Sequence, residues 1–214
     1  SHGGITVGPD GGSHQAIEDI GLMRILPNMT VIIPADAEEM RQVVYKVLEH
    51  NGPVYIRGSR VKFPVIHNNS NYKFEVGKGE VLREGNDLTI VAIGLMVSFA
   101  LKAAEILSQQ GIKIRVINMA TIKPIDEELL IDSAQKTGAI LTVEEHLING
   151  GLGSAVCEVL MEKYPVLVKR MGINDRFGVS GQPEELLKYF RLTPEDIVLE
   201  AQELLKRKFS FQAV

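Results

Sequence analysis

Side chains that can exchange or hold a proton are concentrated at the start of the chain. His2, Asp10 and His14 lie within fourteen residues that also contain five glycines. A histidine titrates near neutral pH, and an ionised aspartate accepts hydrogen bonds. Small residues around polar ones, without apolar periodicity, are typical of a loop that carries function. The segment therefore predicts a site loop, with a glycine-rich surface turn and incidental histidines as the alternative.

A second group of candidates follows a short β-branched run at residues 54–56. Arg57 and Arg60 come directly after it. Ligands of parallel sheets bind beyond the carboxyl ends of the strands, and a guanidinium group suits bidentate contact with phosphate. The alternative, a solvated cation at the end of a strand, applies more readily to Arg57 than to Arg60.

Three further motifs have weaker signals. The glycine-rich stretch 150–154 lies between a predicted strand and a helix, but it lacks dinucleotide-binding spacing, so a packing turn is favoured over a phosphate site. Glu144, Glu145 and His146 are adjacent on a strand, where neighbours point to opposite faces, so a structural or interface role is favoured over a metal site. Cys157 shares a helical stripe with apolar residues and predicts a buried structural thiol.

The elements that must position these residues alternate between strand and helix. A strand at 30–33, a helix opened by Asp36 with Glu39 at the capping-box position, and a strand at 54–56 form a βαβ unit. A weak helical pattern precedes them at 15–24. The stretch 63–72 is rich in proline and asparagine, and we place a linker at 67–76 between a first domain at 1–66 and a second at 77–214.

The second domain repeats the alternation without an internal repeat or low-complexity tract. Its predicted strands lie at 88–93, 112–117, 139–143 and 166–168. Its predicted helices lie at 97–109, 127–136, 154–163 and 183–190, with a last helix beginning at Thr193 and Pro194. Both domains are therefore expected to be α/β with parallel sheets.

Composition limits the classes of function. A formal charge of −4 predicts no nucleic-acid partner and no attraction to an anionic membrane, and no apolar run is long enough to span a bilayer. A single cysteine excludes an internal disulfide and suits a reducing cytoplasm. The sequence shows no signal peptide, although it begins without Met.

Spaced motifs along the chain resemble those of the transketolase family. Gly8-Pro9-Asp10-Gly11-Gly12-Ser13-His14-Gln15 matches a Gly-x-Asp-Gly-x-Ser/Thr-His-Gln motif of the pyrimidine-binding domain, with Pro9 and Gly12 as departures from its frequent residues. The similarity continues, in order, through the segments 18–19, 26–28, 34–36, 52–53, 59–60, 142–146 and 175–178. The chain is thus similar to the C-terminal portion of a transketolase, or to the C-terminal subunit of a split one: part of a pyrimidine-binding domain, then a complete C-terminal domain.

The resemblance implies roles for the candidate residues. His14 would lie by the reactive carbon of thiamine diphosphate as a catalytic group, and His2 and Asp10 would bind the sugar substrate. Arg60 would bind the phosphate of that substrate. The reaction would transfer a two-carbon ketol unit between phosphorylated sugars, as in the pentose phosphate pathway, and the cofactor would do the bond cleavage.

The same resemblance implies that this chain does not work alone. The family's Gly-Asp-Gly…Asn motif for metal and diphosphate, and its activating glutamate, lie upstream of residue 1. The expectation is that thiamine diphosphate and Mg²⁺ belong to the complete enzyme, that this chain alone binds neither and holds no metal, and that it is inactive. The expected partners are an N-terminal transketolase portion or subunit and a second copy in a homodimer.

Three alternatives stay open. The enzyme 1-deoxy-D-xylulose-5-phosphate synthase shares the Asp-Gly-x-Ser/Thr-His-Gln motif, but Asp175-Arg176-Phe177-Gly178 favours a transketolase. The β subunit of a 2-oxoacid dehydrogenase fits the domain order and matches the motifs less well. A non-catalytic assembly module is the alternative from another class, because only the second domain is complete.

Overall fold

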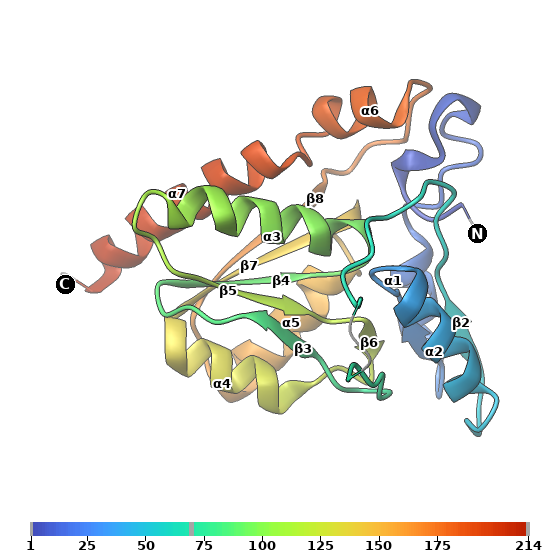
Figure 1. The fold of residues 1–214 in the computed structure, drawn as a ribbon, viewed down its shortest axis with the longest axis horizontal. Coiled ribbons are helices and arrows are strands. Elements are labelled where there is room, and N and C mark those ends of the chain that lie inside the picture. Colours follow the sequence, from blue (N-terminus) through green and yellow to red (C-terminus); the bar gives the residue numbers. More distant parts are fainter. Residues whose placement is uncertain (1, 69–70, 213–214) are drawn as a thin grey trace.

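The chain folds into two sheets that lie side by side. The structure, a computed structural model, describes residues 2–68 and 71–212. A three-stranded sheet belongs mainly to the first domain and a five-stranded sheet to the second (Figure 1). The predicted α/β class is confirmed.

The first domain contains the expected βαβ unit. Strands β1 (Thr30–Ile32) and β2 (Val54–Ile56) pair in parallel, with helix α2 (Ala37–Val47) between them. The Asp36 side chain accepts a hydrogen bond from the Glu39 amide at 2.8 Å, which caps the helix as the spacing predicts. The Glu39 carboxylate reaches one residue further back than in a capping box and accepts from the Ala35 amide at 2.6 Å.

The beginning of the first domain is less helical than its pattern indicates. A 3₁₀ segment, η1 (Ile5–Asp10), precedes helix α1 (Asp19–Ile25). The helix predicted at 15–24 begins only at Asp19, because the backbone of Ala16 is hydrogen-bonded elsewhere. The Ala16 carbonyl accepts from the amide of Gly4, and the Ala16 amide donates to the carbonyl of His2.

The third strand of the first sheet comes from the second domain. Strand β6 (Thr121–Lys123) pairs antiparallel to β1. The sequence pattern does not indicate this strand, because a run of three residues directly after another strand has too little periodicity to be recognised. The two domains therefore share a sheet, and the first sheet is mixed rather than parallel.

The five-stranded sheet has the order β3-β5-β4-β7-β8, and every neighbouring pair except β3 with β5 is parallel. Its strands are β3 (Glu80–Arg83), β4 (Leu88–Ala92), β5 (Ile114–Asn118), β7 (Ala139–Leu147) and β8 (Leu167–Ile173). The edge strand β3 was not predicted, and β7 and β8 extend beyond their predicted ends.

Helices cover both faces of this sheet. The helices α3 (Leu95–Ser108) and α7 (Pro194–Gln212) lie on one face, and α4 (Glu127–Thr137) and α5 (Leu152–Lys163) on the other (Figure 1). Alternate residues of β4 supply the two cores: Leu88, Ile90 and Ala92 pack towards α3 and α7, whereas Val91 packs towards α4 and α5. Helix α6 (Pro183–Tyr189) lies beside the opening segment (Figure 1). Within the described ranges, no helix combines the length and apolarity needed to cross a bilayer.

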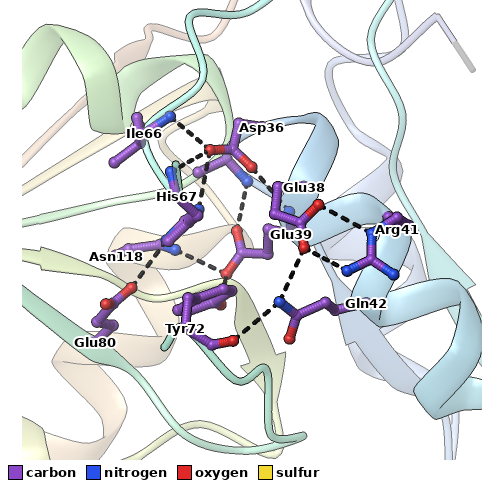
Figure 2. A network of polar contacts seen from close by, with 11 residues as sticks. Asp36, Glu38, Glu39, Arg41, Gln42, Ile66, His67, Tyr72, Glu80 and Asn118 are labelled. Atoms are coloured by element: carbon purple, nitrogen blue, oxygen red, sulfur yellow. Dashed lines mark hydrogen bonds and ion pairs between the residues drawn. The ribbon is translucent and has the colours of Figure 1, made fainter. Parts of the chain in front are cut away.

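A largely buried polar cluster joins the segment between the two domains to each of them. Figure 2 shows this linker cluster, which we define as Asp36, Glu39, His67, Tyr72, Glu80 and Asn118. One carboxylate oxygen of Asp36 lies within 3.0 Å of the ring Nδ1 of His67 and also accepts from the amides of Ile66 and His67. The ring Nε2 of His67 lies 2.8 Å from a carboxylate oxygen of Glu80 on β3.

The charge states in the linker cluster follow from these contacts. Burial alone would lower the pKa of His67, but the hydrogen bonds to Asp36 and Glu80 raise it to about 10, so both ring nitrogens are donors at neutral pH. Burial opposes ionisation of Asp36, yet the hydrogen bonds from His67 and the backbone hold its pKa below its usual range. Burial raises the pKa of Glu39, which contacts Tyr72 Oη and accepts from Asn118 at 2.9 Å.

Candidate functional site

The opening segment folds back on itself and exposes its polar tip. Gly8 and Gly11 adopt positive φ angles of 85° and 75°, which residues with a side chain rarely adopt, and these allow the reversal. The amide of His14 donates to the carbonyl of Gly11 at 3.0 Å and closes a turn. Asp10 and His14 are exposed, and His2 is half-buried. The loop therefore presents a carboxylate and an imidazole to solvent from a fixed backbone.

Two of the predicted substrate contacts lie together. The Arg60 guanidinium, beyond the carboxyl end of β2, forms an ion pair with the carboxylate of Asp10. The two side chains are 49% and 36% exposed. Ion pairs with this exposure contribute little to stability, because water competes for both charges. The pair thus places a cation and an anion at an open surface, where neither charge contributes much to the stability of the fold.

His14 and His2 make different contacts. The Nδ1 atom of His14 lies 3.0 Å from the hydroxyl of Ser13. When that hydroxyl donates, the ring proton lies on Nε2, at the outer end of the ring. His2 has φ 78°, and its carbonyl accepts from the amide of Ala16 at 3.1 Å, so its backbone is fixed next to the loop.

Arg57 is not the solvated cation that the sequence suggested. It is buried, and its Nε lies 3.0 Å from the carboxylate of Asp19. Its Nη2 donates to the carbonyls of Ala16 at 2.7 Å and Glu145 at 3.0 Å. Because β2 ends beneath the opening segment, Arg57 points into the protein and joins α1, the loop and β7, while Arg60 reaches solvent three residues later.

A groove adjoins the carboxyl ends of β1 and β2. Its volume is about 350 Å³, and it is lined by residues 34, 36–37, 40, 57–59 and 61–63. Lys62 adds a cation to this wall that sequence reasoning did not single out. The open position at the strand ends is the place where parallel sheets bind ligands.

Comparisons with known proteins identify the family. The model of the transketolase pyrimidine-binding domain matches residues 1–65, and the model of the transketolase C-terminal domain matches residues 77–197. The chain belongs to the transketolase family. Members of this family depend on thiamine diphosphate.

Relatives of this chain include parts of transketolases. A transketolase C-terminal section from Methanocaldococcus jannaschii is 47% identical over 97% of this chain and 66% of its own length. A 6-deoxy-6-sulfo-D-fructose transketolase subunit from Clostridium sp. (strain MSTE9) is 46% identical over 96% of this chain and 63% of its own length. The chain thus spans slightly less than two thirds of these transketolase parts.

A solved structure and a second enzyme class complete the comparison. The structure of a split-gene transketolase, described as an inactive β4 tetramer, has a TM-score of 0.86 and 51% identity over 92% of this chain and 64% of that one. A 1-deoxy-D-xylulose-5-phosphate synthase from Heliobacterium modesticaldum is 40% identical over 94% of this chain and 31% of its own length.

The glycine-rich turn at 150–154 does not fit the diphosphate of the cofactor. Both carboxylate oxygens of Glu144 already accept hydrogen bonds from the first turn of α5, from Leu152 at 2.7 Å and Gly153 at 2.8 Å. A Cβ at Gly151 would overlap that carboxylate. An anion from the protein itself therefore occupies the place where a phosphate would bind, and the packing-turn interpretation describes this contact correctly.

Strand alternation separates the neighbours of Glu144 as expected. Glu144 and His146 lie on one side of β7, with 3.7 Å between Oε2 and Nδ1, whereas Glu145 points to the opening segment. Burial raises the pKa of Glu144 to about 7 and also raises that of Glu145. In the part of the chain that the structure describes, no three His, Cys, Asp or Glu residues are grouped so that they could hold a metal ion.

Cys157, predicted to be buried, is only half-buried. Burial nevertheless raises the pKa of its thiol, which disfavours the reactive thiolate.

Proposed function

We propose that this chain is the C-terminal part of a transketolase that transfers a two-carbon ketol unit between phosphorylated sugars. The observation that carries the proposal is the exposed opening loop, which presents His14 to solvent and pairs Asp10 with Arg60, within a chain that belongs to the family. Thiamine diphosphate, held with Mg²⁺ by an N-terminal portion or subunit, supplies the nucleophilic carbon. The proposal includes the division into domains at 1–66 and 77–214 with the linker at 67–76.

The exposed groups suit a phosphorylated sugar. Arg60 offers a planar fork of donors to the substrate phosphate, and when it turns to that phosphate it leaves Asp10 free to accept from a sugar hydroxyl. His2 contributes a further hydrogen bond to the sugar. In the tautomer in which Nδ1 donates to the Ser13 hydroxyl, His14 takes the proton of a substrate hydroxyl at its outer nitrogen, Nε2, and later returns it.

A partner and a second copy belong to the proposal. A structural neighbour of this chain is described as an inactive β4 tetramer of a split-gene transketolase, which supports a chain that associates with itself and needs another subunit for activity. We expect a homodimer as the minimal unit in the complete enzyme, in the cytoplasm.

Reconstitution tests the proposed function. The chain alone should show no ketol transfer and no micromolar binding of thiamine diphosphate with Mg²⁺ in calorimetry. The same chain mixed with the N-terminal transketolase portion should transfer a two-carbon unit from a ketose phosphate to an aldose phosphate. Absence of transfer in the mixture, with both parts folded and associated, would contradict the proposal.

The synthase is the second candidate, favoured by 40% identity to a 1-deoxy-D-xylulose-5-phosphate synthase over nearly the whole chain. The same reconstituted mixture separates the two. Formation of 1-deoxy-D-xylulose 5-phosphate, without transfer between sugar phosphates, would assign the chain to the synthase.

A further inference from the structure

The loop that carries Asp10 and His14 rests mainly on the second domain. Its contact with the rest of the first domain includes the exposed ion pair between Asp10 and Arg60. Among its contacts with the second domain, those with Glu145 and with residues 178–180 lie at two separate places. We call these the Glu145 contact and the 178–180 contact.

The Glu145 contact holds the base of the loop. The carboxylate of Glu145, which is buried on β7, accepts a hydrogen bond from the Thr6 amide at 2.6 Å. The backbone of Gly4 lies so close that a Cβ there would overlap this carboxylate. The Glu145 carbonyl also accepts from Arg57 at 3.0 Å, and Arg57 binds the carbonyl of Ala16 at the other end of the loop. One residue of the second domain therefore fixes both ends of the opening loop.

The 178–180 contact holds the tip of the loop. The side-chain amide of Gln15, next to His14, donates to the carbonyl of Val179 at 2.9 Å. A Cβ at Gly178 would overlap the side-chain oxygen of Gln15, and a Cβ at Gly12 would lie 2.6 Å from the carbonyl oxygen of Gly178. The loop tip and residues 178–180 thus approach each other as closely as two backbones without side chains can.

Apolar packing supports the same arrangement. Ile5 and Ile17, one on each side of the loop, are completely buried in the core that contains α6 and α7 of the second domain. Gln15 also donates to the carbonyl of Ile5 at 3.1 Å, so a single side chain links the base of the loop to the 178–180 contact.

From these observations we propose that the second domain positions the catalytic loop, with Glu145, Gly178 and Gln15 as positioning residues. The inference rests on the proposed function, because it takes Asp10 and His14 as the groups that meet the substrate. A displacement of about 1 Å at such groups lowers the rate by about a hundredfold. The Asp175–Gly181 stretch, otherwise distant from the chemistry in sequence, thereby acquires a role in the reaction.

The test compares two glycine substitutions in the full chain assembled with its N-terminal portion. Gly178→Ala should lower kcat/KM about ten- to a hundredfold, because the added methyl group displaces Gln15. Gly111→Ala is the matched control: it strains a residue at φ 79° that has open space around it, after α3 and at the opposite end of the strands. The control should lower the melting temperature and leave kcat/KM within twofold.

A spectroscopic measurement keeps the inference independent of turnover. In the chain alone, the imidazole NMR signals of His14 should shift in Gly178→Ala and stay in place in Gly111→Ala. Equal signals in the two variants would overturn the positioning role, even if the complete enzyme transfers no ketol unit and the proposed function fails.

Two further variants show whether the effect passes through the named contacts. In a Gln15→Ala background, Gly178→Ala should add less than twofold, because the displaced side chain is already absent. Glu145→Gln keeps an oxygen for the Thr6 amide and should retain most of the activity that Glu145→Ala loses. Additive losses in the first pair, or equal losses in the second, would contradict the inference.

Discussion

Two of the places in the described structure where a histidine occurs with carboxylates, the opening loop and the linker cluster, are built in opposite ways. At the opening loop, Asp10, His14 and the adjoining Arg60 are exposed; the side chain of His14 contacts Ser13, and those of Asp10 and Arg60 contact each other. In the linker cluster, both ring nitrogens of His67 face carboxylates and the ring is 2% exposed (Figure 2). The same residue types are thus exposed to solvent in one place and join the two domains in the other.

The difference shows that residue type alone does not distinguish a ligand site from a structural cluster. What differs is whether the polar side-chain atoms are already hydrogen-bonded within the protein. Breaking a buried, charged network leaves an unpaired charge and is strongly destabilising. An exposed ion pair contributes little to folding, so its groups can be redirected to a ligand. The first cluster should therefore affect catalysis, and the second should affect stability.

The largest expected effect concerns His14. In the reconstituted enzyme, His14→Ala should lower kcat by about 10²–10⁴, the usual contribution of a positioned acid or base. His14→Asn, which keeps a hydrogen bond without proton transfer, should recover little. Steady-state kinetics and thermal melting would be measured together. A variant that melts early but has a normal kcat would show that His14 has a structural role. The two clusters would then not differ in function.

The next largest effect concerns Asp36. Asp36→Ala removes the partner of His67, leaves the amides of Ile66 and His67 unpaired and deletes the cap of α2. The free energy of unfolding should fall by about 3–5 kcal/mol in urea titrations. The matched variant Asp10→Ala, in the exposed cluster, should change it by less than about 1 kcal/mol. Equal losses would show that exposure does not separate the two clusters.

The pH dependence of stability sharpens the comparison. The pKa of His67 is raised to about 10 in the folded chain, so its contribution is complete below about pH 6.5 and is lost as the pH rises through 10. Between pH 7 and 10 the wild-type protein should lose about 3–4 kcal/mol more unfolding free energy than His67→Gln. Parallel pH profiles for the two proteins would mean that His67 is neutral in the fold.

The smallest effect concerns Arg60. Arg60→Ala should lower kcat/KM about ten- to a hundredfold, as for the loss of one charge-assisted contact, and should change stability by less than about 0.5 kcal/mol. The loss should be larger for phosphorylated acceptors than for unphosphorylated ones. Equal losses on both would move the phosphate contact away from Arg60, and Lys62→Ala in the adjoining groove would then be compared.

The parts of the fold that could be predicted are those encoded locally. The alternation of helices and strands, the Asp36 cap and the glycine-bent loop each follow from a few neighbouring residues. Strand β6 could not be predicted, because it is only three residues long and pairs with β1, which is distant in the sequence.

The site divides in the same way. The motif around His14 and the strand-end position of Arg60 could be found in the sequence. The burial of Arg57 and the support from Glu145 could not, because an arginine after a strand has the same local pattern whether it faces solvent or an opposing carboxylate. Whether such an arginine is buried depends on tertiary contacts, and Arg57 and Glu145 are 88 residues apart in the sequence.

The shared sheet has a consequence for synthesis on the ribosome. Strand β1 emerges with one edge unpaired, and its partner β6 follows about 90 residues later. At about 5–20 residues per second, the nascent chain displays that edge for roughly 5–18 seconds. An unpaired edge is a template for pairing with other chains, so this interval is when a chaperone that covers extended segments would be of most use. Slow codons placed between β1 and β6 should therefore increase co-translational aggregation, whereas those placed after β6 should not.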